Sequence, residues 1–196
     1  IAVINKTPIS KETIDKCPNL KGIAVLATGY NVVDYEYAKS KGIQVFNAPG
    51  LNANAVAELT FSKMLDISRG TFVANYDVKV KHEWDKYKFE GRELRGKTLG
   101  IMGFGRIGQR VGELGRAFKM NIVAYDPFLP DDVFKQQCAT KASIDELIKV
   151  ADFISIHVPL TPETKNLFNK KSIAEMKDGA VVLNMSRGGI VNEADM

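Results

Sequence analysis

The sequence predicts an α/β fold built on parallel β-sheets. Short apolar runs, rich in β-branched residues, alternate with stretches of helical period from one end of the chain to the other. These runs lack the polar alternation of half-exposed strands, which is typical of strands covered on both faces. One run also leads through a glycine-rich stretch directly into a helix. A strand-helix-strand order of this kind indicates a doubly wound sheet.

The same pattern gives the order of the elements. The expected strands are residues 1–5, 22–27, 42–47, 97–103, 120–126, 152–158 and 179–185. The expected helices are residues 10–17, 34–41, 53–68, 106–118, 143–150 and 170–176. The alternation breaks over residues 69–96, an arm that holds the only Trp and many charges. The segment NAPG at residues 47–50 is a second break, so we place a domain boundary there, between residues 1–50 and 51–196.

Composition excludes several classes of protein. The chain is 45% hydrophobic and 26% charged, which is typical of globular proteins. Its apolar runs are far shorter than the roughly 20 residues of a membrane span, and its start lacks the pattern of a secretory signal. The net charge of +4 is mild, and carboxylates interrupt the densest basic run, so we expect a solvated arm there and no nucleic-acid partner. Two cysteines without a metal-ligand pattern predict no metal site and a reducing, cytoplasmic location.

The stretch KTLGIMGFGRIGQRVGELGRAFKMNIVAYDPF contains the pattern G-x-G-x-x-G between two strands. Gly103 permits a tight turn, Gly105 lets the backbone approach a pyrophosphate, and Gly108 lets the helix pack closely on the strand. The helix N-terminus then offers N–H groups and a positive dipole end to phosphates. This context predicts a dinucleotide-binding turn. A glycine-rich turn of another α/β protein, or a methyltransferase-like nucleotide site, is the alternative.

Asp126 ends the strand after this helix, close to the spacing of about 20 residues expected of the acid that binds the ribose hydroxyls. A carboxylate there would repel the 2′-phosphate of NADP. The residue that follows is Pro127 and not the arginine that such a phosphate requires. The sequence therefore predicts NAD as the cofactor.

Two further side chains follow strands at the sheet edge where open α/β folds bind ligands. His157 ends the strand DFISIHV and begins a proline-stiffened loop, which we expect to be a wall of the cofactor site. Whether His157 also moves a proton stays open. Arg187 follows the strand GAVVLNM, and its planar, permanently charged fork suits a carboxylate or a carbonyl oxygen. The alternative is an ordinary capping or surface arginine in a turn.

Taken in order, five segments resemble the D-isomer-specific 2-hydroxyacid dehydrogenase family over essentially the whole chain. They are LKGIAVLATGYNVVD, NAPGLNANAVAELT, ELRGKTLGIMGFGRIG with AYDPF, HVPLTPETKNLFN and NMSRGGIVNE. The resemblance implies that residues 1–50 are part of a flavodoxin-like substrate domain and that residues 51–196 are a Rossmann-like NAD-binding domain. It further implies a homodimer, with the dimer elements at about residues 53–96, and hydride transfer between NAD(H) and a small D-2-hydroxy acid or 2-keto acid.

The resemblance also assigns roles to individual residues. Arg187 is similar to the family's catalytic arginine, which orients the substrate carboxylate and polarises the keto oxygen. The expected substrate-binding residues are Ala27, Thr28, Gly29 and Asn52. The expected cofactor-binding residues are Gly103, Gly105, Arg106, Ile107, Gly108, Asp126, His157, Val158, Pro159, Thr164, Met185 and Ser186. Among them, Arg106 and Ile107 would cover the pyrophosphate and Asp126 would bind the adenosine ribose.

The family also uses a histidine paired with an acid to move the hydroxyl proton, and by the resemblance both would follow Met196. We therefore expect the chain to be an internal, C-terminally incomplete fragment that is inactive by itself.

The substrate loop differs from the family's common pattern. Where many members have G-x-D-N-x-D, residues 29–34 read GYNVVD. The ATG at the start of this loop is most similar to the glycerate dehydrogenase (hydroxypyruvate reductase) branch. Dehydrogenases of 3-phosphoglycerate, D-lactate or formate stay open as alternatives. The rival of another class is an NAD-sensing corepressor of the same family.

Overall fold

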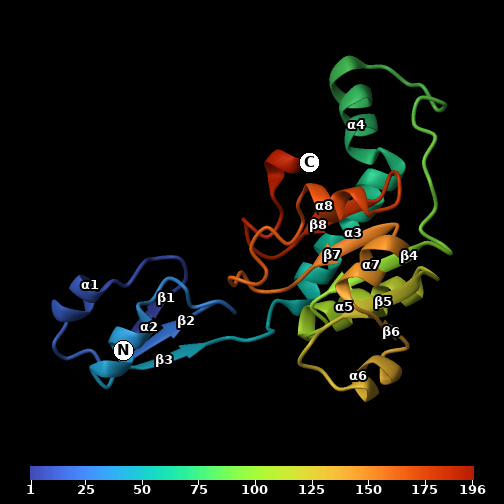
Figure 1. Cartoon of the computed structure of the whole chain (residues 1–196). Helices are drawn as coiled ribbons and strands as arrows, with labels where there is room; N and C mark the ends of the chain where they lie inside the picture. The colour runs from blue at the N-terminus through green and yellow to red at the C-terminus, as the bar shows by residue number, and fades with distance from the viewer. The chain divides into compact units, whose positions relative to one another are not determined.

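The computed structural model describes residues 1–196, which divide into two compact units, Ile1–Asn52 and Ala53–Met196. Each unit has its own sheet, and all strand pairs in both sheets are parallel (Figure 1). The α/β fold class predicted from the sequence is therefore confirmed.

The unit Ile1–Asn52 holds a three-stranded sheet in the order β1-β2-β3. Its strands are β1 (Ala2–Ile4), β2 (Gly22–Val25) and β3 (Gln44–Asn47), and its helices are α1 (Lys11–Asp15) and α2 (Tyr35–Ser40). Both helices begin at a capping side chain: Ser10 accepts from the amide of Thr13, and Asp34 accepts from that of Tyr37. Asp34, the acid of the segment GYNVVD, thus caps a helix.

The unit Ala53–Met196 holds a five-stranded sheet in the order β6-β5-β4-β7-β8. The strands are β4 (Thr98–Met102), β5 (Asn121–Tyr125), β6 (Thr140–Lys141), β7 (Phe153–Ile156) and β8 (Val181–Asn184). The last residues of the four long strands are in register, since Met102 pairs with Tyr125 and with Ile156, and Ile156 pairs with Asn184. Chain order reverses around β4, so this carboxyl edge has a topological switch point.

Both faces of this sheet are buried, as its apolar strands predict. Successive residues of β4 and β7 enter different cores: Leu99, Ile101 and Phe153 pack with α3 and α5, while Met102 and Ile154 pack with α7. The helices of the unit are α3 (Ala53–Arg69), α4 (Thr71–Tyr76), α5 (Arg106–Ala117), α6 (Asp131–Gln136), α7 (Ile144–Val150) and α8 (Lys170–Ala174). No helix is both long and apolar enough to cross a membrane.

Residues 69–96 contain more helix than the sequence pattern indicates. Helix α4 continues into a π-helical turn at Asp77–Lys81, after which the chain runs without regular structure to β4. Within its unit, this segment extends outward from the sheet and its covering helices (Figure 1). The short elements α6 and β6 are also absent from the sequence prediction, and a 3₁₀ turn at Glu193–Asp195 follows β8.

Candidate functional site

The turn between β4 and α5 requires glycine at its first position. Gly103 has φ +87°, and a Cβ added there would lie 3.0 Å from the backbone carbon of His157 and from the backbone nitrogen of Val158. The Gly103 amide donates to the carbonyl of Tyr125 at 2.8 Å. The turn is therefore packed directly against the backbone of two neighbouring strands, and a side chain at Gly103 would push it out of the sheet edge.

The other two glycines of the pattern differ in their surroundings. A Cβ at Gly108 would lie 2.2 Å from the carbonyl oxygen of Gly103, so the helix packs on the turn at backbone distance. A Cβ at Gly105 would meet nothing within 4 Å. Gly105 is also the N-cap of α5, where no side chain caps the helix. This open, uncapped helix N-terminus is suited to a phosphate group.

Asp126 lies beside this turn and helps to hold it. One carboxylate oxygen, Oδ2, accepts from the amide of Phe104 at 2.9 Å, and Oδ1 accepts from the amide of Phe128 at 3.0 Å. A carboxylate has about four acceptor positions, so each oxygen keeps capacity for a ribose hydroxyl. Asp126 therefore links the glycine-rich turn to the loop after β5 while it presents negative charge at the sheet edge.

A pocket of about 550 Å³ opens at this edge, within the volume range of small-molecule sites. Seven of the predicted cofactor-binding residues line it: Gly103, Gly105, Asp126, His157, Val158, Pro159 and Thr164. The rest of the lining is Tyr125, Pro127, Phe128, Ile144, Thr161, Glu163 and Leu167. The lining has no lysine or arginine, so a pyrophosphate would rely on backbone amides. A backbone cradle, an acid for the ribose and apolar walls together fit a dinucleotide.

Five predicted cofactor-binding residues do not line this pocket: Arg106, Ile107, Gly108, Met185 and Ser186. Ile107 and Met185 pack against the apolar core on the α3 and α5 side of the sheet. The Ser186 hydroxyl donates to the carbonyl oxygen of Val158, so it contacts a residue of the pocket wall.

The sequence did not single out Tyr125, Phe128 and Ile144 of the lining, whereas Glu163 and Leu167 lie in the loop after His157 that it predicted as a wall of the site. Phe128 stands two positions after the ribose acid and is 92% exposed at the pocket. The sequence could have indicated Phe128 by its position, because an aromatic ring two residues after Asp126 offers a flat apolar face to a base.

His157 is the one histidine of the pocket, and burial holds it neutral. Burial lowers the pKa of His157 from 6.5 to about 4. Its Nε2 lies 2.8 Å from the hydroxyl oxygen of Ser155, which is fully buried in β7, and its Nδ1 has no hydrogen-bond partner. The side chain is thus a neutral imidazole at pH 7, which favours a role as a pocket wall over proton transfer.

Arg187 lies in the turn after β8, at the same edge of the sheet. It is exposed, and its Nη1 donates to the carbonyl of Ser186 at 3.2 Å. It forms no ion pair with a carboxylate of the chain. An exposed arginine in a turn also fits the alternative of a surface or capping residue, but because its guanidinium has no carboxylate partner it is available to bind an external anion.

In the unit Ile1–Asn52, the loop after β2 brings three of the predicted substrate-binding residues together. The Thr28 hydroxyl donates to Asn52 Oδ1 at 3.0 Å, and Ala27 accepts from the amide of Ala48 at 3.0 Å. The amide side chain of Asn47 donates to the carbonyl of Thr28 at 2.6 Å. Gly29 follows in the same loop. No group of three or more His, Cys, Asp or Glu side chains is placed to hold a metal ion.

The parallel sheet, the glycine-rich turn and the carboxylate of Asp126 beside it are typical of a dinucleotide-binding α/β protein. Residues 61–196 match the family described as D-isomer specific 2-hydroxyacid dehydrogenase, NAD binding domain. The chain belongs to this family, which confirms the resemblance seen in the sequence and the prediction of NAD as the cofactor.

Several relatives carry enzyme names. The chain is 42% identical to D-3-phosphoglycerate dehydrogenase of Methanocaldococcus jannaschii, over 98% of this chain and 37% of that protein. It is also 42% identical to hydroxypyruvate reductase of Thermotoga maritima, over 98% of this chain and 62% of that protein. The structure of D-lactate dehydrogenase from Aquifex aeolicus, complexed with NAD and lactic acid, matches with a TM-score of 0.84 at 36% identity, over 97% of this chain and 57% of that one. The chain thus spans less than two thirds of the length of these relatives.

The conformation of Gly103 leads to a first prediction. We expect Gly103→Ala to destabilise the unit Ala53–Met196 by about 1–3 kcal/mol, the range for a strained backbone position, and to weaken NADH binding about 10-fold or more by shifting the turn. Gly42→Ala is the matched control, because Gly42 has φ +72° but a Cβ there would meet nothing within 4 Å. Urea unfolding and NADH fluorescence titration measure both effects. Unchanged NADH affinity in Gly103→Ala would contradict the assigned turn.

The buried imidazole leads to a second prediction. The imidazole has a pKa of 6.5 in the unfolded chain and of about 4 in the folded one. Between these two values the unfolded state binds the proton more readily, so the free energy of unfolding falls by about 3 kcal/mol as the pH is lowered from 6.5 to 4. Carboxyls whose pKa is lowered in the fold, such as Asp77, lose their contribution only below their ordinary value of 3.8. We expect His157→Asn to lose less stability than the wild type between pH 7 and pH 4.5 in urea unfolding. His82→Asn is the control, because His82 is exposed. Equal losses of stability in His157→Asn and the wild type would refute the lowered pKa of His157.

Proposed function

We propose that the protein carrying this chain is an NAD-dependent oxidoreductase that interconverts a small 2-keto acid and the D-2-hydroxy acid. The observation that carries the proposal is that a pocket and an unpaired arginine lie at the same edge of the sheet in Ala53–Met196. The pocket there is lined by the glycine-rich turn and Asp126, and Arg187, without a carboxylate partner, follows a strand at the same edge. The names of the relatives support the same class of reaction.

In this proposal each unit has one task. Residues 51–196 bind the cofactor, through the residues predicted from the sequence, and the bound nicotinamide supplies or accepts the hydride. Arg187 orients the substrate carboxylate and polarises the keto oxygen through its two parallel N–H donors. Residues 1–50 belong to the substrate domain, in which the backbone of Ala27, Thr28 and Gly29 binds the substrate carboxylate and Asn52 completes that loop. The neutral His157 forms a wall and does not relay the proton.

The first substrate pair that we propose is hydroxypyruvate and D-glycerate, because the loop ATG is most similar to that branch and hydroxypyruvate reductases are among the relatives. Phosphohydroxypyruvate and pyruvate are the alternatives, named by the other relatives. We place the protein in the cytoplasm, which suits its two exposed, unpaired cysteines.

Steady-state kinetics test this proposal. We expect the complete protein to oxidise NADH with hydroxypyruvate in preference to glyoxylate, pyruvate and phosphohydroxypyruvate. Arg187→Lys should lower kcat/KM on the order of 100-fold, because a lysine cannot form the bidentate contact. Arg92→Lys is the control, since Arg92 donates to the carbonyl of Gly179 away from the proposed site. Reduction of none of these keto acids would overturn the proposed activity.

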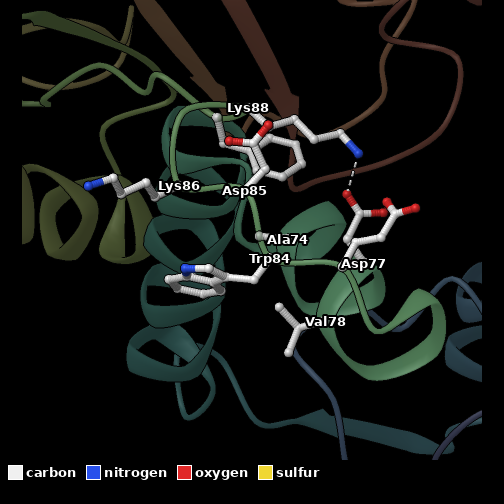
Figure 2. A pocket seen from close by; sticks show the side chains of 9 residues that line it. Ala74, Asp77, Val78, Trp84, Asp85, Lys86 and Lys88 are labelled. Atoms are coloured by element: carbon white, nitrogen blue, oxygen red, sulfur yellow. Dashed lines mark hydrogen bonds and ion pairs between the residues drawn. The ribbon is translucent and has the colours of Figure 1, made fainter.

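We also propose a homodimer built on α3, α4 and the arm. These segments expose large apolar side chains that a monomer leaves in water, including Phe72 at 76%, Trp84 at 81% and Tyr87 at 71%. The arm is held in shape by Asp77, whose buried carboxylate lies 2.7 Å from Lys81 Nζ and 2.6 Å from Lys88 Nζ. Figure 2 shows Lys88 reaching Asp77 across a small pocket that Trp84 also lines. An arm held in this way is suited to pack against a second copy.

Trp84 gives the prediction for the dimer. We expect Trp84→Ala to shift the protein toward monomers, raising the dimer dissociation constant about 10-fold or more, because buried Trp residues are typical anchors of interfaces. Light scattering coupled to gel filtration over a concentration series measures this. Phe128→Ala is the control, since Phe128 is as exposed as Trp84 but lies at the cofactor pocket. A wild type that is monomeric at all concentrations would exclude the dimer.

A further inference from the structure

The turn that carries Arg187 is closed by a single amide side chain. Asn184 is the last residue of β8, and its Oδ1 accepts from the amide of Ser186 at 3.1 Å. Its Nδ2 donates to the carbonyl of Arg187 at 2.8 Å. Both ends of the Asn184 amide are thus engaged with the backbone on either side of the arginine. A side chain with only an acceptor could not make both bonds.

The same turn is tied to the wall of the cofactor pocket. The Ser186 hydroxyl donates to the carbonyl oxygen of Val158, and the amide of Met185 donates to that of Ile156 at 3.2 Å. Val158 lines the pocket together with its neighbours His157 and Pro159. Two hydrogen bonds, made by the residues just before Arg187, therefore join the turn to the pocket wall and to the strand that leads into it.

A second attachment follows Arg187. The amide of Asn166 donates to the carbonyl of Gly189 at 2.8 Å, and the amide of Phe168 donates to that of Ile190 at 3.1 Å. Phe168 and Ile190 are both buried, so these bonds lie next to the apolar core. The backbone of Arg187 is thereby fixed on both sides by the segment 156–168, while its side chain stays exposed.

We propose that Asn184 and Ser186 are positioning residues, which hold the guanidinium of Arg187 at a fixed place relative to the cofactor pocket. This inference rests on the proposed function of Arg187. An arginine that binds an anion loses the rotamer freedom of its side chain. Because the backbone of the turn is already fixed by hydrogen bonds, no backbone freedom has to be lost in addition when the guanidinium binds. Asn184 controls the shape of the turn, and Ser186 controls its distance from the wall.

Four variants of the complete protein test the inference. Asn184→Ala removes both bonds of the amide, and Ser186→Ala removes the bond to Val158. Ser186→Thr keeps the hydroxyl. Asn121→Ala is the control, because Asn121 Nδ2 also donates to a backbone carbonyl, that of Gly96, but at the amino end of β5. The readouts are kcat, KM, the Kd of NADH, the melting temperature, and calorimetric binding of oxamate, an analogue of a 2-keto acid, to the NADH complex.

We expect Asn184→Ala and Ser186→Ala to lower kcat/KM and oxamate affinity about 10- to 100-fold, the range for a misplaced binding group. NADH affinity in Asn184→Ala should stay within about 3-fold of the wild type, because the pocket lining is unchanged. Ser186→Thr should recover most of the loss, and Asn121→Ala should lose nothing. A residue that merely stabilised the fold would lower the melting temperature and leave oxamate binding by the folded protein intact.

Arg187→Ala separates the two proposals. If Arg187→Ala binds oxamate and turns over like the wild type, the proposed function of Arg187 fails. If Arg187→Ala loses both while Asn184→Ala and Ser186→Ala keep both, the function stands and the positioning role is overturned. Should Asn184→Ala not fold, the comparison of Ser186→Ala with Ser186→Thr decides the question from oxamate binding at saturating NADH, where a contact of Ser186 with the cofactor does not change how much NADH complex is present.

Discussion

The contact between the glycine-rich turn and the end of β7 is the constraint on which the site depends. At Gly103, whose φ is +87°, the backbone passes so close to His157 and Val158 that a Cβ would lie only 3.0 Å from their backbone atoms. That approach brings the N-terminus of α5 to the sheet edge, beside the loop whose residues form the pocket wall. Gly108 adds a second close contact, of the helix on the turn. The shape of the pocket at this edge therefore depends on a close approach of backbone segments that glycine permits.

Parallel pairing then gathers the chemistry at one edge. In a parallel sheet all strands end on the same side, and the strand order β5-β4-β7-β8 sets the sequence of groups along it. Asp126 follows β5, the glycine-rich turn follows β4, His157 follows β7 and the turn of Arg187 follows β8. Segments separated by dozens of residues become neighbours without any long-range signal in the sequence. Ligand binding at such an edge, outside a topological switch point, is a general property of open α/β sheets.

The sequence predicted the long, buried elements well because their periodicity reflects burial on both faces. It missed α6, since this helix is six residues long and buries only Phe134, which leaves too little pattern to detect. It also treated the basic run at residues 79–97 as solvated, whereas Lys81 and Lys88 of that run contact the buried carboxylate of Asp77, four and eleven positions away. An ion pair of that kind depends on the path of the chain. The pocket residues that were missed lie mostly in loops, where the conformation and not the residue type decides which side chain faces the ligand.

The acidic side chains of the site lie in the pocket, whereas the positive charge of Arg187 lies in the turn after β8. The ionisable side chains of the pocket lining are Tyr125, Asp126, Glu163 and the neutral His157, so the lining carries no positive side chain. In the proposed function the phosphates of a dinucleotide are bound by backbone N–H groups, which the glycine-rich turn fixes in place, and are covered by Arg106. The guanidinium of Arg187 is then not needed to neutralise the cofactor. In the proposed function this leaves it available for the substrate carboxylate, and the turn closed by Asn184 determines where that carboxylate binds.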